Sequence, residues 1–343
     1  FDEATDTYAT TWAEIDVGCQ ACHGAGQEHV DWANGGEGRK ELPGISRQQQ
    51  LDACGPCHSR RSEMVVDAVP GGPLLDAYLP AVPTPPRYHA DGQIRDEVYV
   101  LGSFMQSRMH EVGVVCSDCH DPHRATTLRD GNALCLGCHG SAPPERFAEN
   151  LTSDRSYDTP DHHRHAPGST GAQCIGCHMP AQIYMGVDAR RDHSFRTPRP
   201  ALAARIGAPD ACTACHTDRS QGWAADAMRE WKLDPDDPTH LGNAIALGEL
   251  DRVSAIASAG ARPIVRAAAV DWLSRTGAPA EAIRTAAGDP NALVRAYAAR
   301  SAASLSPAER AVAIAALLDD PAHSVRLAAA DALAEVPASS LED

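Results

Sequence analysis

The sequence has no long apolar runs, no surplus of basic residues and few aromatic side chains. No stretch approaches the ~18 consecutive apolar residues of a membrane-spanning helix, so we predict no membrane span. The 30 basic against 46 acidic residues give a formal charge of −16. This argues against a nucleic-acid partner, because such binding depends on Lys and Arg. Phe, Trp and Tyr make up only 5% of the chain, so flat apolar cofactors would have to supply part of the core.

Cysteine is absent outside a single pattern. All 12 cysteines fall into six Cys-x-x-Cys-His motifs, which we number 1 to 6 in chain order. The motif residues are Cys19, Cys22 and His23 (motif 1); Cys54, Cys57 and His58 (motif 2); Cys116, Cys119 and His120 (motif 3); Cys135, Cys138 and His139 (motif 4); Cys174, Cys177 and His178 (motif 5); Cys212, Cys215 and His216 (motif 6).

This spacing matches the chemistry of covalent haem attachment. Two thiols one helical turn apart form thioethers with the vinyl groups of a haem, and the next residue, a histidine, becomes the proximal iron ligand. Zinc sites need two CxxC pairs on one metal and do not require a histidine after each pair. Disulfide frameworks have no such regularity, and Cys54-Gly-Pro-Cys57, although spelled like a thioredoxin motif, lacks a surrounding βαβ pattern. We therefore predict six covalently attached haem c groups, with iron as the metal.

The histidines outside the motifs are candidate sixth ligands. Of the 16 histidines ten lie outside the motifs, and eight of these lie between the first and last motif. Six irons with two axial histidines each would need six of the eight, which predicts mostly bis-His iron with no open position. The candidates are His29, His89, His110, His123, His162, His163, His165 and His193. One or two of His162, His163 and His165 are expected to ligate. Methionine is the alternative ligand, although core packing is the expected role of the nearby methionines.

Composition divides the chain in two. Residues 1–235 carry all six motifs between Pro- and Gly-rich stretches such as residues 70–73 and 83–86, and predict short helices joined by loops that wrap porphyrins. Residues 236–343 contain no cysteine and are rich in Ala, Leu, Val and Arg at helical spacing. The fold class predicted is therefore mainly α: a loop-rich hexahaem cytochrome domain followed by an α-helical repeat domain.

An internal repeat supports this second domain. Three segments align on Val265-Arg266, Val294-Arg295 and Val325-Arg326, about 30 residues apart. Each unit is predicted to be a helix pair, in the manner of short HEAT-type repeats that form a small α-solenoid. An ordinary helical bundle is the alternative. A solenoid would offer a surface for partner binding or subunit packing.

The motif-bearing part resembles a family of multihaem cytochromes with C-terminal TPR- or HEAT-like repeats. This family is related to the cytochrome c554, hydroxylamine oxidoreductase and pentahaem nitrite reductase group. The matching stretches lie within residues 8–220 and include residues 17–24 with His29, 88–94, 116–123, 174–180 and 190–195. In the wider group, Cys-His-Met-Pro followed by a downstream histidine binds haem, which implies that His178 is a proximal ligand and His193 a distal one. Family members carry further upstream motifs, so the chain is expected to be a fragment or to have lost those haems. No CxxCK motif and no assignable crosslinking tyrosine marks a catalytic haem here.

Together these features predict an electron-transfer protein with redox partner proteins and no catalytic residues of its own. Haem attachment to CxxCH takes place outside the cytoplasm, so the protein is expected in the periplasm or outside the cell. An export signal is expected to have preceded Phe1. The chain could also form a homo-oligomer or a haem wire, through either the motif region or the repeats. The alternative is a reductase of nitrite, hydroxylamine or a sulfur oxyanion that uses one open haem, with Tyr184, Arg190 and Arg191 as distal-pocket candidates.

Overall fold

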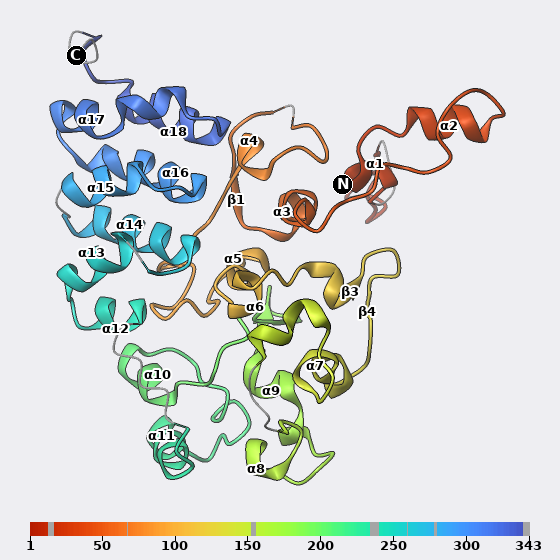
Figure 1. The fold of residues 1–343 in the computed structure, drawn as a ribbon, viewed down its shortest axis with the longest axis vertical. Helices are drawn as coiled ribbons and strands as arrows, with labels where there is room; N and C mark the ends of the chain where they lie inside the picture. Colours follow the sequence, from red (N-terminus) through yellow and green to blue (C-terminus); the bar gives the residue numbers. More distant parts are fainter. Residues whose placement is uncertain are drawn as a thin grey trace.

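The computed structural model describes residues 1–12, 17–66, 68–151, 156–233, 240–258, 260–277 and 280–338. We call residues 1–233 the motif region and residues 240–338 the helix stack. The two lie side by side, with the stacked C-terminal helices along one side of the molecule and the CxxCH segments along the other (Figure 1). The fold is mainly helical with little strand, as predicted. The predicted boundary between residues 235 and 236 lies outside the described residues.

The motif region consists of short elements joined by long loops. Its helices are α1 (Cys19–His23), α2 (Gln27–Ala33), α3 (Gln50–His58), α4 (Leu74–Ala77), α5 (Leu101–Phe104), α6 (Arg108–Glu111), α7 (Asn132–His139), α8 (Pro160–His163), α9 (Cys174–His178), α10 (Pro200–Ile206) and α11 (Gln221–Glu230). The 3₁₀ turns are η1 (Cys116–Asp118), η2 (Glu145–Asn150) and η3 (Thr170–Ala172). Strands pair antiparallel only as small hairpins: β1 (Arg61–Glu63) with β2 (Tyr78–Pro80), β3 (His120–Asp121) with β4 (Thr126–Thr127), and β5 (Ala181–Tyr184) with β6 (Asp188–Arg191). Among the described residues, no helix is long and apolar enough to cross a bilayer.

Four of the six motifs close a helix on their histidine. Helices α1, α3, α7 and α9 each end at the motif histidine, so the two thiols, three residues apart, lie on the same face of the last turn. Motif 6 forms a single turn, in which the His216 amide donates to the Cys212 carbonyl at 2.9 Å. Motif 3 is built differently: η1 ends at Asp118, and after Cys119 the motif histidine His120 begins β3. A single turn of helix or 3₁₀ helix is thus present in each motif.

Helix α3 packs closely against α4. A Cβ atom placed on Gly55 would lie 2.7 Å from a methyl carbon of Leu74 in α4, so a larger residue here would require the Leu74 side chain to shift. Gly55 in motif 2 therefore has a packing role apart from any redox chemistry.

The helix stack is a series of antiparallel helix pairs. Its helices are α12 (Leu241–Ala246), α13 (Leu250–Ser258), α14 (Pro263–Thr276), α15 (Ala280–Ala287), α16 (Ala292–Ser301), α17 (Pro307–Ile314) and α18 (His323–Leu333), with 3₁₀ turns η4 (Ala302–Ser304) and η5 (Ala315–Asp319). The three Val-Arg segments fall in α14, α16 and α18, which pack against one another in that order. The residue directly before the valine is buried in each repeat, as Ile264, Leu293 and Ser324, so the sequence repeat corresponds to a repeated packing position.

The arginines of the first two repeats each bind the following repeat. Arg266 forms a two-pronged ion pair with Asp289, with both N–O distances at 2.8 Å. Arg295 pairs in the same way with Asp320, at 2.5 and 3.0 Å. Arg326, the third member, donates to the backbone carbonyls of Asp320 and Pro321. These side chains are largely buried, so the ladder fixes the stagger of successive helix pairs.

The Pro-rich segment between motifs 2 and 3 attaches the motif region to the helix stack. The Tyr297 hydroxyl of α16 donates to the Pro80 carbonyl at 2.9 Å and accepts from the Val82 amide at 3.2 Å. Thr84 donates to Asp271 of α14 at 2.7 Å. Leu79 and Val82 belong to the same apolar core as the stack helices. This segment was predicted only as turn and extended loop, and its docking role was not foreseen.

Candidate haem centres

Four motif histidines face a histidine from elsewhere in the chain. In each pair the ring centroids are separated by nearly the same distance. The pairs are His23 with His123 at 6.1 Å, His120 with His193 at 6.3 Å, His178 with His162 at 6.1 Å, and His216 with His165 at 6.0 Å. Each pair joins one motif histidine to one predicted distal histidine. The structure thus brings together His123, His162, His165 and His193 with the proximal positions of motifs 1, 5, 6 and 3.

This separation fits two imidazoles bound to opposite faces of one iron. A ligating imidazole nitrogen lies about 2 Å from its metal and about 1 Å from its own ring centroid, so two such rings have centroids about 6 Å apart. Direct stacking of two rings would bring the centroids closer, and an unrelated pair would have no reason to keep the same distance four times. Each of the four pairs therefore leaves room for an iron between its two rings. The donor set in these pairs suits haem.

Hydrogen bonds select the nitrogen that can bind the metal in every pair. Nδ1 of His23, His178 and His193 lies 2.7, 2.9 and 2.9 Å from the carbonyl oxygens of Pro43, Arg196 and Arg191. Nδ1 of His165 makes the same contact with the His163 carbonyl. Since a carbonyl only accepts, Nδ1 carries the proton and Nε2 keeps its lone pair. One member of each pair is therefore fixed as an Nε2 ligand.

The loops that present the distal histidines are held by aspartates. Asp121 accepts from the His123 amide at 3.0 Å in the turn that follows motif 3. Asp192, almost fully buried, accepts from the Ser194 amide at 2.8 Å and so forms the tight turn around His193. Short polar side chains that bond the backbone two residues ahead stabilise such turns. These local turns therefore fix the positions of His123 and His193.

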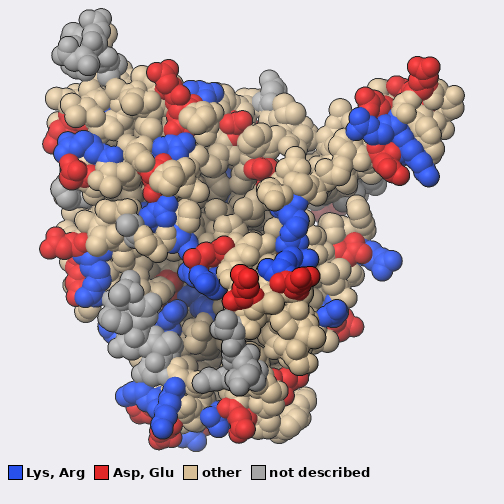
Figure 2. Space-filling view, viewed as in Figure 1, with Lys and Arg blue, Asp and Glu red and all other residues tan. Residues whose placement is uncertain are grey.

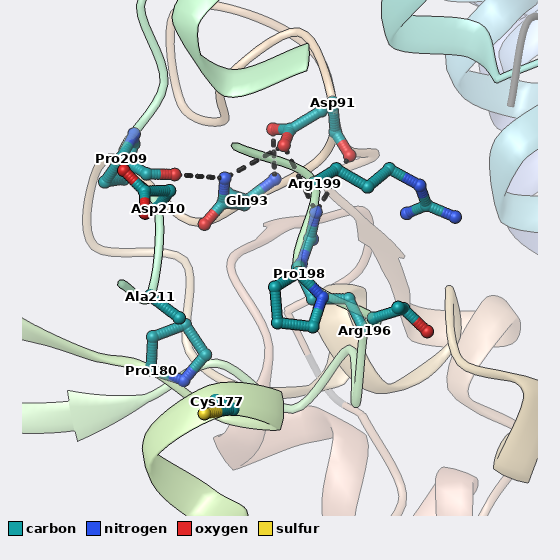
Figure 3. A pocket seen from close by; sticks show the side chains of 11 residues that line it. Asp91, Gln93, Cys177, Pro180, Arg196, Pro198, Arg199, Pro209, Asp210 and Ala211 are labelled. Carbon is teal, nitrogen blue, oxygen red and sulfur yellow. Dashed lines mark hydrogen bonds and ion pairs between the residues drawn. The ribbon is translucent and has the colours of Figure 1, made fainter. Parts of the chain in front are cut away.

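A buried polar cluster joins three loops beneath motif 5. Gln93 donates to Asp91 at 2.9 Å and to the Pro209 carbonyl at 2.8 Å, while Arg196 lies between Asp91 and Asp192 at 3.4 and 3.6 Å. These groups line a narrow pocket whose far side is formed by Cys177 (Figure 3). The cluster connects the 89–93 turn, the loop of His193 and the start of motif 6. It therefore fixes the loop of His193, the distal histidine of one pair, relative to motif 6, which supplies the proximal histidine of another pair.

Asp118 clamps motif 3 to the segments before motif 2 and after motif 4. Its buried carboxylate accepts two hydrogen bonds from Arg47, both at 2.7 Å, and one from Arg146. Burial alone would raise the pKa of this carboxyl, but the bonds from Arg47 and the Val115 amide, with the charge of Arg146, hold the pKa below its usual range. Motif 3 therefore has a fixed position between its neighbours.

Neighbouring motifs meet through their thiols. A hydrogen bond joins the Cys54 and Cys116 thiols. It lowers the pKa of Cys116 to about 7 and raises the pKa of Cys54. Burial and the nearby thiol of Cys22 raise the pKa of Cys54 further. Cys135 and Cys174 form a second such pair, with the pKa of Cys135 lowered and that of Cys174 raised. Thioethers do not titrate, so these pKa shifts describe the free thiols only. What matters for the haem-loaded protein is that the motifs lie close together. Motif 1 thus lies beside motif 2, motif 2 beside motif 3, and motif 4 beside motif 5.

The two remaining links complete the series. Burial, then the charge of Asp118 and the Cys138 thiol, raise the pKa of Cys119 to about 11, which places motif 3 beside motif 4. Burial, followed by Asp210 and the Cys177 thiol, raises the pKa of Cys212 to about 12, which places motif 6 beside motif 5. The six motifs therefore follow one another in space in the same order as in the sequence.

Two motif histidines have no facing imidazole. Among the described residues, no histidine lies at the pair separation from His58 or His139. His139 instead meets the edge of Tyr157, with ring centroids at 5.9 Å. Four predicted distal histidines are likewise not brought opposite a motif histidine: His29, His89, His110 and His163. The assignment of these four as iron ligands remains a prediction.

The residues considered for a substrate pocket are engaged in a hairpin. The Tyr184 hydroxyl accepts from the Tyr99 amide at 2.9 Å, and Arg190 lies over the Tyr184 ring while pairing with Asp188. Arg191 donates to the carbonyls of Ile175 and Met179 behind motif 5. These contacts stabilise β5, β6 and α9, and none of the three side chains faces an unpaired motif histidine.

Sequence reasoning missed the aromatic residues that contact the imidazoles. Tyr157 meets both His139 and His162 edge-on, at 5.9 and 5.2 Å, and Trp223 lies 5.0 Å from His216. Both residues come from elements outside the motifs. With so few aromatic residues in the chain, their position near motifs 4 and 6 is the only sequence signal that could have drawn attention to them.

A family model for paired CXXCH motifs matches part of the motif region. This model, described as "Doubled CXXCH motif", matches residues 110–143, which contain motifs 3 and 4. Among solved structures, the chain is similar to the one titled "Crystal Structure of Outer Cell Wall Cytochrome OcwA", with 18% sequence identity, a TM-score of 0.47, and coverage of 86% of this chain and 71% of that chain. No curated protein matches the chain. With the doubled motif and the imidazole pairs, the chain has the covalent haem c attachment sites of a multihaem c-type cytochrome.

The alternatives for the cysteines have no counterpart in the structure. The thiols of all six motifs are free of disulfides. Within the described ranges, no three His, Cys, Asp or Glu side chains come together as a metal site, as a zinc centre would require. Each paired centre offers two imidazoles and two thiols, which is the donor set that haem c takes from a protein.

Proposed function

We propose that this chain is an electron-transfer protein that carries six covalent haems, in the spatial order of their motifs along the sequence. Four of the irons are bis-His, with the pairs His23–His123, His120–His193, His162–His178 and His165–His216. The haems supply the redox chemistry, each iron cycling between the ferric and ferrous states. The chain attaches them through the motif cysteines, orients the imidazoles and excludes water.

The observation that carries this proposal is the recurrence of the same imidazole separation in four pairs. An iron with two imidazole ligands has no position for substrate, and its low potential compared with Met/His iron suits transfer along a chain. The closeness of successive motifs supports transfer from one haem to the next, because each attachment point lies near the next one. The aspartate turns and the carbonyl bonds to Nδ1 hold the ligands in place through both oxidation states.

The helix stack is proposed to be a HEAT-like α-solenoid that serves as a docking or assembly surface. The repeated Arg–Asp ladder and the repeated buried position in α14, α16 and α18 support this assignment. The partners are redox proteins or further copies of the chain, so that an end-to-end haem wire could form. Attachment of haem to CxxCH takes place outside the cytoplasm, which favours the periplasm or the cell exterior.

Low-temperature EPR of the oxidised protein tests the electron-transfer proposal. We expect low-spin ferric signals from the four bis-His centres, unchanged by nitrite, hydroxylamine or cyanide. A matched pair of variants sharpens the test: His193→Ala should convert one low-spin signal to high spin, whereas His240→Ala, at the N-terminal cap of α12 in the helix stack, should leave all signals as they are. High-spin signals from all six haems in the unaltered protein would contradict the proposal.

A reductase with one open haem is the second candidate, and His139 favours it. This motif histidine faces no imidazole among the described residues and meets Tyr157 instead. A high-spin ferric signal that shifts on adding nitrite or cyanide, and that Tyr157→Phe alters, would support this candidate over pure electron transfer.

A further inference from the structure

His29 is prepared as a metal ligand although no motif histidine faces it. Its Nδ1 lies 2.6 Å from the carbonyl oxygen of Lys40, so that nitrogen carries the proton and Nε2 keeps its lone pair. The same arrangement fixes His23, His178 and His193 in the imidazole pairs. Of the four histidines that no pair includes, His29 has this bond. By contrast, Nδ1 of His163 accepts from the His165 amide at 3.2 Å.

The imidazole is carried by an arm that stands clear of the body. The arm comprises α2 and the segment that returns to residue 42, and both views show it projecting from the rest of the molecule (Figures 1 and 2). Its shape is fixed by bonds between its two limbs: the Arg39 amide donates to the Glu28 carbonyl at 3.0 Å and the two side chains form an ion pair at 3.2 Å. The arm is therefore an ordered platform.

Apolar side chains flank His29 at the surface. The Trp32 ring lies 5.7 Å from the imidazole and is 41% exposed, and Val30 is 48% exposed. A polar, solvent-facing helix would not place a tryptophan and a valine beside a ligand-ready histidine. This combination suits a flat apolar group whose metal the imidazole binds, as the edge of a porphyrin would be.

The body of the chain presents the motif histidine His58 at its surface. His58, the proximal position of motif 2, is exposed, and among the described residues no imidazole lies at the pair separation from it. His110, another histidine that no pair includes, packs edge-on against Phe104 at 5.4 Å, and burial followed by the charge of Arg262 lowers its pKa. One copy thus carries a ligand-ready imidazole on its projecting arm and, in the described part of its body, an exposed motif histidine that faces no other imidazole.

We propose that Nε2 of His29 is the sixth ligand of the haem iron held by His58 in a second copy of this chain. The proposal rests on haem attachment at motif 2, which is part of the proposed function. Because the arm and motif 2 are different surfaces, the contact can repeat head-to-tail as an open chain or be made reciprocally in a two-fold dimer, and the mass of the assembly separates these two arrangements. Val30 and Trp32 would cover the edge of the bound haem. Each copy carries a formal charge of −16, so association should strengthen as salt screens the repulsion.

The test uses the full, haem-loaded protein and follows mass and spin state together. Light scattering and low-temperature EPR are recorded over a range of protein concentrations, at low and at moderate ionic strength, for the unaltered chain, His29→Ala and the control Gln27→Ala on the same arm. We expect the unaltered chain and the control to associate more strongly as concentration and salt rise, with loss of one high-spin signal. His29→Ala should associate at least about 10-fold more weakly and keep that signal at every concentration. Added imidazole should return its iron to low spin without restoring association.

Two outcomes would overturn the inference. Equal spin states and equal association of His29→Ala and the unaltered chain would show that His29 binds no iron. A high-spin signal in His29→Ala, with an unaltered chain that is low-spin and monomeric at all concentrations, would place the iron within the same chain. Failure of the proposed function would look different, since a haem count below six by pyridine haemochrome absorbance would reveal it independently of association.

Discussion

The helix stack and the motif region are built on different principles. In the stack, almost every helix contributes fully buried aliphatic side chains to one continuous core, to which Leu79 and Val82 of the motif region also belong. Among the described residues of the motif region, Tyr88, Ile94 and Val98 form the one separate apolar cluster. The motif cysteines and histidines are at least partly exposed in the polypeptide alone.

This difference indicates that the motif region depends on its cofactors for folding. A region of more than 200 residues with so small a core cannot offset its conformational entropy from its own side chains. Its order rests on hydrogen bonds, ion pairs such as that of Asp118 with Arg47, and the apolar surface that haems bring. The stack needs no such help, so the two regions should respond in opposite ways to loss of cofactor and to changes in core packing.

The largest expected effect comes from preventing haem attachment. When the chain is produced without haem maturation, we expect the motif region to lose its protection while the stack retains its helices. Hydrogen exchange with peptide resolution measures this, with fast exchange expected around α7 and α9 and slow exchange around α14 and α16. Equal protection of the motif region with and without haem would contradict a structural role for the cofactor.

Within the stack, the Arg–Asp ladder should be the most sensitive polar contact. Asp320→Ala leaves the buried Arg295 guanidinium without its partner and removes an acceptor from the Ala322 amide. We expect the free energy of unfolding of the stack to fall by about 3–5 kcal/mol. Asp319→Ala, on the exposed neighbour, is the control and should change it by less than about 0.5 kcal/mol. Denaturant titration followed by far-UV circular dichroism compares the two.

Coupling between the two regions should depend on Tyr297. Tyr297→Phe leaves the Pro80 carbonyl and the Val82 amide unbonded in a buried interface, and we expect a loss of about 1–3 kcal/mol. Calorimetry should show the motif region and the stack unfolding further apart in temperature than in the unaltered chain. Tyr8→Phe removes the same hydroxyl from an exposed ring and should leave the thermogram unchanged.

The smallest expected effect is a loss of stability of the stack at acid pH. Burial by itself would raise the pKa of Asp320, but bonds from Arg295 and the Ala322 amide hold it below its usual range. A carboxyl whose pKa is lowered in the folded state stabilises fully above its unfolded pKa of about 3.9, and this contribution is lost as pH falls through the folded value. Denaturant midpoints should therefore decline below about pH 4. Asp320→Asn should decline less steeply over the same range.

The sequence predicts the parts of the fold that depend on local pattern. The spacing Cys-x-x-Cys-His identifies each attachment site, and the recurrence of Val-Arg predicts the three helices α14, α16 and α18. The distal histidines were predicted only as a set. His123 follows motif 3 yet lies opposite His23 of motif 1, and His193 follows motif 5 yet lies opposite His120 of motif 3. Such pairings depend on how loops cross between motifs, which no spacing encodes.

Contacts between distant segments were beyond sequence reasoning for the same reason. The Pro-rich segment near Pro80 looks like an ordinary loop, since its partner Tyr297 lies far along the chain. Tyr157 likewise carries no local signal of its contact with both His139 and His162. The arm that carries His29 was expected only as sequence flanking motif 1, and its projection from the body emerges from the three-dimensional structure.

The most direct test of the account counts haems and axial ligands in one sample. Intact-protein mass spectrometry under denaturing conditions gives the number of covalent haems, and near-infrared magnetic circular dichroism of the oxidised protein distinguishes bis-His from Met/His iron. The account predicts six haems per chain, at least four of them bis-His. Fewer than six covalent haems, or Met/His bands from the centres assigned to the four imidazole pairs, would contradict it.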